Sequence, residues 1–163
     1  VVDSDEVIVA GGCFWGVEAL LAQEPGVVKT EVGYCGGHLE APSYEQVCQG
    51  DSGHYEAVRL LFDKQKTTLE QVLKVFFECH DPFQSEGQGA DIGNQYQSAV
   101  FYYNLGQKET AASLLEQLKH HGRLPATVLL AVRAFWAAEA YHQQYFEKNH
   151  QPISCHRRGK RFF

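Results

Sequence analysis

The sequence predicts a single α/β domain of the α+β kind, in which helices pack on one mixed β-sheet. The chain has 163 residues, 44% of them hydrophobic, which is enough for one domain with a sizeable core. Short apolar runs typical of strands alternate with amphipathic stretches typical of helices along the whole chain. The sequence contains no internal repeat, low-complexity segment or linker, so residues 1–163 are expected to form one unit.

The expected strands are short runs of apolar residues bounded by glycine, proline or polar turn residues. They lie at 6–10, 27–34, 55–62, 98–103 and 126–132. Gly11 and Gly12 end the first strand, and a glycine pair at 36–37 ends the second.

The expected helices have apolar residues at helical spacing, and polar capping residues begin several of them. Phe14 opens the first, which stops at Pro25-Gly26. Ser43 and Thr68 are positioned to cap the second and third. The last two are expected at 107–120 and 137–148.

Two segments have no clear periodicity. Residues 80–97 contain few apolar side chains and several glycines, and long ordered loops of this kind are often functional. Residues 150–163 are expected to form an irregular tail, in which the basic cluster at 157–161 is solvated.

Charge and cysteine content exclude several functional classes. The formal net charge of −6 disfavours binding to nucleic acid or to an anionic membrane surface, and no apolar run reaches bilayer length. The five cysteines are odd in number, widely spaced and without a Cys-x-x-Cys pair, so neither a secreted disulfide framework nor a zinc site is indicated. We expect a cytoplasmic monomer with thiol chemistry, although a leader removed before Val1 would be compatible with the sequence.

Cys13 is the strongest chemical candidate. It lies in the segment GGCFWG (11–16), at the junction of a predicted strand and a predicted helix. The unpaired N–H groups of a first helical turn favour a thiolate, and Phe14 and Trp15 are suited to an aromatic pocket wall. An inert cysteine buried in a tight turn is the alternative, and the position alone is compatible with both.

The segment GGCFWG resembles the signature of A-type peptide methionine sulfoxide reductases, which act on methionine S-sulfoxide. Further segments resemble the same family in order along nearly the whole chain. They are VGYCGG at 32–37, SY at 43–44, VCQG at 47–50, GHYEAV at 53–58, HDP at 80–82, QGAD at 88–91, GNQY at 93–96, and AE with YHQQY and KN between 138 and 149.

The resemblance implies a ferredoxin-like core and a reaction for Cys13. The Cys13 thiolate attacks the sulfoxide sulfur and becomes a sulfenic acid. Glu56 matches the family's acid, and a carboxyl in an apolar site can stay protonated near neutral pH. Tyr44 and Tyr96 match the tyrosines that hydrogen-bond the sulfoxide oxygen.

Three more residues match substrate contacts of the family. Phe14 and Trp15 match the pocket for the S-methyl group, and Asp91 matches the carboxylate that holds the substrate's main chain. Each also has a common structural explanation: core packing for the aromatic residues and loop capping for Asp91.

The resemblance also implies a route for recycling. Cys155, the only cysteine in the tail, lies near the family's resolving position, and Cys35 in a glycine-flanked segment is the alternative. Cys48 and Cys79 lie on predicted helices and are expected to be structural. Thioredoxin would supply the electrons, dithiothreitol would replace it in vitro, and no metal or organic cofactor is implied. Oxidised proteins and free methionine sulfoxide would be the substrates, in protein repair and antioxidant defence.

Two other functions remain open on the residues alone. A thiol hydrolase or acyltransferase would pair Cys13 with His80 or His54 as its base. A redox-sensing module would oxidise Cys13 without turnover.

Overall fold

The computed structural model describes residues 4–50, 52–85, 87–89, 91–119, 124–153, 156, 158–159 and 161–162. Its main sheet has the spatial strand order β7-β6-β1-β3-β2-β8. The strands are β1 (Ser4–Gly11), β2 (Val27–Cys35), β3 (Tyr55–Asp63), β6 (Ser98–Tyr102), β7 (Val128–Ala131) and β8 (Phe135–Ala137). β6 and β7 run parallel and all other neighbours are antiparallel, so the predicted mixed sheet is confirmed.

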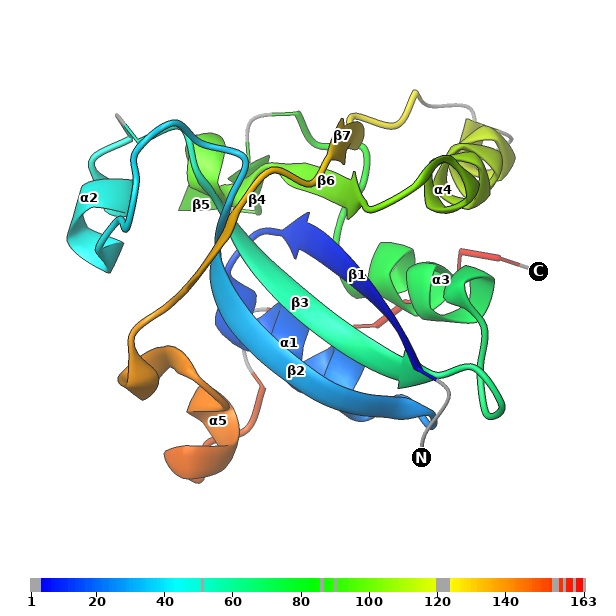
Figure 1. Ribbon diagram of the computed structural model, residues 1–163, viewed down its shortest axis with the longest axis horizontal. Coiled ribbons are helices and arrows are strands. Elements are labelled where there is room, and N and C mark those ends of the chain that lie inside the picture. Colours follow the sequence, from blue (N-terminus) through cyan, green and yellow to red (C-terminus); the bar gives the residue numbers. More distant parts are fainter. Residues whose placement is uncertain are drawn as a thin grey trace.

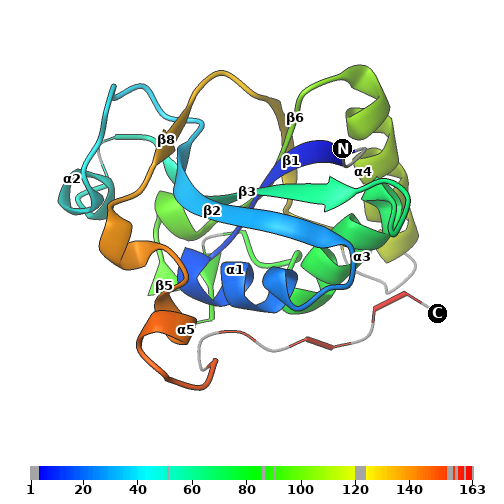
Figure 2. The same ribbon diagram turned by 60° about the horizontal axis from the view of Figure 1, so that its bottom comes forward.

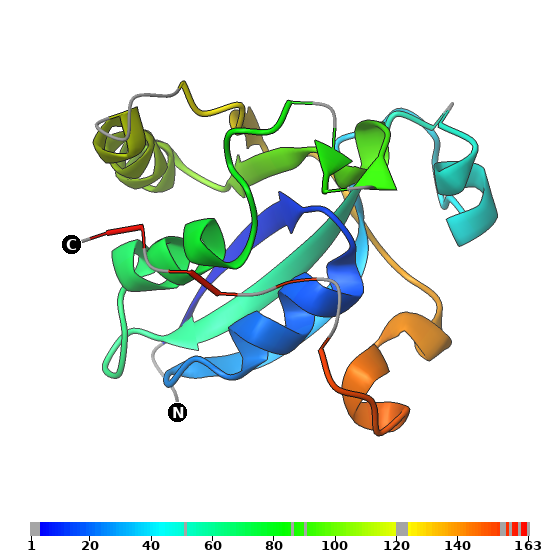
Figure 3. The same ribbon diagram turned by 180° about the vertical axis from the view of Figure 1, so that it is seen from behind.

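Two helices cover one face of the sheet. α1 (Phe14–Ala22) connects β1 to β2, and α3 (Leu69–Cys79) follows β3 and leads through the long loop to β6 (Figures 1 and 3). The series β1-α1-β2-β3-α3-β6 with the spatial order β6-β1-β3-β2 is the expected ferredoxin-like core. α4 (Leu105–Leu118) packs beside α3 and is followed by β7. In the described part of the chain, no helix is both long enough and apolar enough to cross a bilayer.

Alternation along the strands separates two hydrophobic clusters. On β3, Val58, Leu60 and Phe62 face the helices and join the large cluster, while Ala57 joins a smaller cluster on the other face. Because side chains alternate with a period of two, Glu56 belongs to the helix-covered face. The sheet therefore carries a carboxyl group into the apolar layer beneath α1.

Capping residues fix two helices where the sequence predicts them. Ser43 begins α2 (Tyr44–Cys48) with a complete capping box, and the Thr68 hydroxyl accepts the Gln71 N–H at the start of α3. α4 begins two residues earlier than predicted, because the Asn104 side chain accepts the backbone N–H of Gln107.

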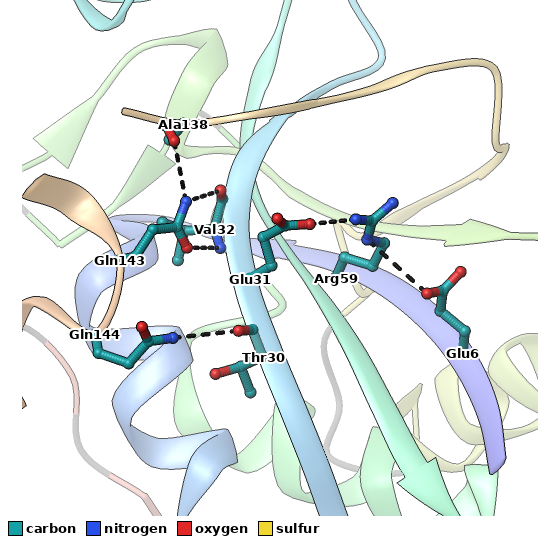
Figure 4. A network of polar contacts seen from close by, with 8 residues as sticks. All are labelled: Glu6, Thr30, Glu31, Val32, Arg59, Ala138, Gln143 and Gln144. Carbon is teal, nitrogen blue, oxygen red and sulfur yellow. Dashed lines mark hydrogen bonds and ion pairs between the residues drawn. The ribbon is translucent and has the colours of Figure 1, made fainter. Parts of the chain in front are cut away.

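The predicted helix at 137–148 is wrong. The segment instead contains the end of β8, a 3₁₀ turn at Ala140–His142 and the short helix α5 (Tyr145–Lys148), seen beside α1 in Figure 2. The side-chain amide of Gln143 bonds the backbone N–H and C=O of Val32 at 2.9 and 2.8 Å, as a neighbouring strand would (Figure 4). Gln144 has a φ of +48°, outside the helical region. In this segment, hydrogen bonds to β2 thus take the place of the hydrogen bonds of a helix.

The described part of the loop at 80–97 contains regular structure that the sequence did not predict. It contains a two-stranded ladder of β4 (Gly87–Gln88) and β5 (Asp91–Ile92), followed by a 3₁₀ turn, η1 (Asn94–Tyr96). The Gln88 side chain accepts the Asp81 N–H at 2.7 Å and donates to the Asp81 carbonyl at 2.6 Å. These bonds fix the loop against the end of α3.

The described tail residues form neither helix nor strand, as predicted, but they are not simply solvated. The Arg158 guanidinium lies 2.9 Å from the buried carboxylate of Glu78. The Gly159 N–H donates to the Glu78 carbonyl at 2.8 Å, and the Arg161 N–H donates to the Glu78 carboxylate at 3.1 Å. Arg158 is exposed, as expected of a solvated residue, although it pairs with Glu78. The expectation of a solvated cluster is wrong for Arg161, which is half-buried and bound to the Glu78 carboxylate.

Candidate functional site

Cys13 occupies the predicted junction. It is the N-cap of α1 and is partly exposed, and its carbonyl accepts the Val17 N–H at 3.4 Å. Gly12 has a φ of +96°, and a Cβ there would lie 2.6 Å from the Gln88 side chain and 3.3 Å from His156 Nε2. Only glycine allows the loop and the tail to approach the backbone this closely before Cys13.

Glu56 is the most unusual group near Cys13. Its side chain is 1% exposed, Oε1 accepts the Phe14 N–H at 3.3 Å, and Oε2 is buried without a hydrogen-bond partner among the described residues. Burial, reinforced by the neighbouring Cys13, raises the pKa of Glu56 to about 9. The carboxyl is therefore protonated at neutral pH, and its Oε2 has no hydrogen-bond partner in the described part of the chain.

This burial makes stability depend on pH, which gives a first prediction. Between about pH 4.5 and 9 the unfolded chain releases the Glu56 proton while the folded protein keeps it, so stability falls as pH rises. Glu56→Gln removes this slope and should raise the free energy of unfolding by about 1–3 kcal/mol near pH 7. Urea unfolding of the unmodified protein and of Glu56→Gln at pH 6 and pH 8 measures this difference in the free energy of unfolding. An equal difference at the two pH values would show that Glu56 is not held protonated by burial.

Tyr44 comes from α2. Its backbone N–H donates to the Glu139 carboxylate at 3.1 Å, and its ring stacks on Phe14 with the centroids 6.3 Å apart. The Tyr34 hydroxyl donates to the other Glu139 oxygen at 2.9 Å. Burial, and next the nearby Glu56, raise the pKa of Tyr44, so its phenol is neutral.

Tyr96 and Asp91 come from the long loop. Burial, and next Glu56, raise the pKa of Tyr96 to about 12. Asp91 is exposed on β5, and its charge contributes to the raised pKa values of both Glu56 and Tyr96. The structure therefore gathers Cys13, Glu56, Tyr44, Tyr96 and Asp91 from separate elements into one electrostatically coupled site.

Phe14 and Trp15 lie differently from each other. Phe14 is 1% exposed and contacts the rings of Tyr34, Tyr44 and His142. Trp15 is half-buried and points toward α5: its Nε1–H donates to His142 Nδ1 at 2.9 Å. Its ring stacks on Tyr145 with the centroids 3.8 Å apart. The Phe14 ring thus packs against the Tyr44 ring, and Trp15 connects α1 to the segment after β8.

Sequence reasoning missed Glu139 and His142. Glu139 holds Tyr34 and Tyr44, and His142 is completely buried between Phe14, Trp15 and Tyr44. A signal was available: in a helix, polar residues at 139, 142 and 143 would share one face with the apolar Phe146. A helix face of that mixed composition is not expected to pack in a hydrophobic core.

The other cysteines fall into different environments. Cys35 is the last residue of β2, fully buried in the smaller cluster on the face of the sheet away from α1, and burial raises its pKa to about 12. It does not lie in a movable loop, as its candidacy as resolving residue required. Cys48 is the last residue of α2, on a helix as predicted, and it is exposed, so its structural role stays a prediction. Cys79 is buried, and Cys155 lies outside the described residues.

Neither candidate histidine is available as a base for Cys13. His80 is buried, with Nδ1 2.8 Å from the Phe76 carbonyl and Nε2 2.7 Å from the Ser98 hydroxyl. Burial lowers its pKa to about 3. His54 Nε2 lies 2.6 Å from the Leu39 carbonyl, and Nδ1 accepts the Gly37 N–H. Both rings hold backbone segments together, which removes the support for a Cys/His hydrolase.

A metal site is not formed by the residues that the structure describes: they contain no group of three or more histidine, cysteine, aspartate or glutamate side chains that could hold an ion. That the protein needs neither a metal nor an organic cofactor stays a prediction.

Comparisons with known proteins agree on one family. A family profile described as peptide methionine sulfoxide reductase matches residues 5–162. Relatives named peptide methionine sulfoxide reductase MsrA include one from Methanosarcina acetivorans, 47% identical over 88% of this chain and 78% of its own length. Another, from Acinetobacter baumannii, is 46% identical over 92% of this chain and 87% of its own.

Solved structures give the same result. Reduced Mxr1 from Saccharomyces cerevisiae has a TM-score of 0.88 and 32% identity, covering 93% of this chain and 89% of its own. Methionine sulfoxide reductase A of Corynebacterium diphtheriae has a TM-score of 0.82 and 31% identity, covering 90% and 75%. The family profile spans nearly the whole chain, and the relatives share almost half of its residues over that length. The chain therefore belongs to the peptide methionine sulfoxide reductase family.

Proposed function

We propose that the protein reduces the S epimer of methionine sulfoxide, free or in proteins, and so serves in protein repair and antioxidant defence. The observation that supports this most strongly is Glu56, a carboxyl with a raised pKa and an unpartnered buried oxygen beside Cys13. A sulfoxide is a poor electrophile until its oxygen is protonated. A protonated acid next to a thiol supplies both groups that the reaction requires.

In the proposed reaction the Cys13 thiolate attacks the sulfoxide sulfur while Glu56 protonates the sulfoxide oxygen. The oxygen is then transferred: the sulfur–sulfur bond formed by the attack and the S–O bond of the substrate break, and a bond from the Cys13 sulfur to the oxygen forms. Methionine leaves, and Cys13 is left as a sulfenic acid. Tyr44 and Tyr96 are neutral donors because their pKa values are raised, and they stabilise the developing charge on the oxygen.

Substrate positioning is assigned to the aromatic residues and Asp91. Phe14 and Trp15 are assigned to the apolar side of the site for the S-methyl group, and the Phe14 ring stacks on the ring of Tyr44. Asp91, whose side chain is exposed, is assigned to hold the substrate's main chain.

Recycling is assigned to Cys155 and thioredoxin. The Cys155 thiol attacks the sulfenic sulfur, a disulfide with Cys13 forms, and water leaves; thioredoxin then reduces the disulfide. Yeast Mxr1 has been crystallised in complex with Trx2, which supports a partner of this class. No metal or organic cofactor takes part, dithiothreitol replaces thioredoxin in vitro, and a monomer in the reducing cytoplasm fits this chemistry.

The test is an assay with separated sulfoxide epimers. Each epimer of a methionine sulfoxide peptide is incubated with the protein and dithiothreitol, and methionine is quantified by chromatography. Turnover of the S epimer alone supports the proposal. Turnover of the R epimer alone, or of neither, would contradict it, and ester hydrolysis without a reductant would support the hydrolase instead.

Cys155→Ser separates catalysis from recycling. We expect the variant to release one methionine per enzyme at the normal rate, because Cys13 and Glu56 are intact, but to lose thioredoxin-supported turnover. The disulfide of the unmodified protein, formed with one equivalent of sulfoxide, is mapped by mass spectrometry. Normal turnover of Cys155→Ser with thioredoxin, or a disulfide from Cys13 to another cysteine, would show that Cys155 is not the resolving residue.

A further inference from the structure

The tail is attached to the body of the protein on both sides of position 157. On one side, the buried imidazole of His156 lies with Nε2 2.8 Å from the Gly11 carbonyl, so Nε2 donates a hydrogen bond to it. On the other side, Glu78 binds Arg158, Gly159 and Arg161 through its carboxylate and its carbonyl. Figure 3 shows the tail crossing the helix face beside α1 and α3.

His156 contacts the backbone close to Cys13. The carbonyl that it contacts belongs to Gly11, two residues before Cys13, and Gly12 lacks the side chain that would crowd the same ring nitrogen. A Cβ on Gly12 would also lie within 3 Å of the side chain of Gln88, which belongs to the long loop. The strand-to-helix junction that presents Cys13 is thus lined by the loop and by His156.

A contact at this place bears on the recycling step. A disulfide requires Cα atoms roughly 4.4–6.8 Å apart, and consecutive Cα atoms in a chain are only about 3.8 Å apart. Fixing His156 at Gly11 therefore restricts where its neighbour in the sequence can go. Such a restriction raises the effective concentration of one reacting group at another.

We propose that His156 is a positioning residue for the second half of the reaction, and that the Glu78 contacts hold the tail in the same register. This inference rests on the proposed function, in which Cys155 attacks the Cys13 sulfenic acid. In that step the S–S bond forms, the S–O bond breaks and water leaves, so no further oxidant or reductant is needed. His156 touches neither sulfur nor substrate in this role, and it acts through the backbone that it holds.

The test measures the two chemical phases separately. The full-length protein is mixed with one equivalent of S-sulfoxide peptide and quenched at intervals; methionine release reports the first phase, and loss of alkylatable thiols reports the second. In His156→Ala we expect the first phase to stay within about twofold and the second to slow about tenfold, as for the loss of one positioning hydrogen bond.

Two variants make the result specific. His156→Gln keeps an N–H donor of similar reach and should restore most of the second-phase rate. His38→Ala makes the same substitution at an exposed histidine and should change neither phase. A first phase slowed as much as the second, or a second phase unchanged in His156→Ala, would overturn the inference.

Mapping the disulfide distinguishes failure of this inference from failure of the proposed function on which it rests. If a Cys13–Cys155 disulfide forms in His156→Ala at the unmodified rate, the positioning role is wrong and the recycling route stands. If the unmodified protein forms a disulfide between other cysteines, both are wrong.

Discussion

Cys13→Ser is expected to abolish reduction of methionine sulfoxide, with a loss on the order of 10⁴-fold or more, as for other deletions of a nucleophile. A serine hydroxyl is not significantly ionised at neutral pH, so without a base it is a poor nucleophile. Glu56 cannot serve, because burial keeps it protonated, and His80 and His54 are engaged with backbone and side-chain partners. The measurement is methionine release with excess dithiothreitol.

A control variant shows that the loss is specific to the position. Cys35→Ala removes a thiol that is buried on the opposite face of the sheet, and it should keep the rate. Near-ultraviolet circular dichroism verifies that the Cys13 variant is folded. Residual reductase turnover in folded Cys13→Ser would show that another group is the nucleophile.

Glu56→Gln is expected to slow sulfenic acid formation by about 10²–10⁴-fold while leaving substrate affinity nearly unchanged. The amide has almost the shape of the carboxyl, and its oxygen can still accept the Phe14 N–H that Oε1 accepts now. It cannot release a proton to the sulfoxide oxygen. Single-turnover rates at saturating peptide measure the chemical step, and a substrate titration measures the affinity.

The pH profile distinguishes this role from a structural one. Since the pKa of Glu56 is raised to about 9, its acid form is lost as pH rises through that value, and the single-turnover rate should fall there. Glu56→Gln has no such group, so its slow rate should lack this decline. The same decline in both proteins would assign it to another residue, and equal rates at neutral pH would mean that Glu56 does not supply the proton.

Local rules predicted much of the fold because the signals for it are local. The strand at 55–62 and the caps at Ser43 and Thr68 are properties of a few adjacent residues, and the structure confirms them. The segment at 137–148 failed for the opposite reason. Its shape depends on Gln143 and Gln144 binding β2, more than 100 residues earlier in the chain, and no local pattern reports such partners.

The candidate site could likewise be predicted only in part from the sequence. The family motifs identified Cys13, Glu56, Tyr44, Tyr96 and Asp91, and the structure brings these five together, while their roles remain proposals. Glu139 and His142 lie in the quoted motifs AE and YHQQY, but the motifs did not show that these residues hold the site in shape. Glu139 reaches Tyr34 and Tyr44, His142 reaches Trp15, and His156 reaches Gly11, each across about 95 to 145 positions. Only the folded chain shows contacts of this range.

The central claim is that Cys13 accepts the sulfoxide oxygen with the help of Glu56. The most direct measurement uses Cys155→Ser with less than one equivalent of S-sulfoxide peptide and no reductant. Methionine is counted, and the sulfenic acid is trapped with a dione reagent and located by mass spectrometry. We predict one trapped sulfenic acid per methionine released, located on Cys13, and formed at least about 100-fold more slowly when Glu56→Gln is added. Methionine released without modification of Cys13, or at the same rate with Glu56→Gln, would contradict the account.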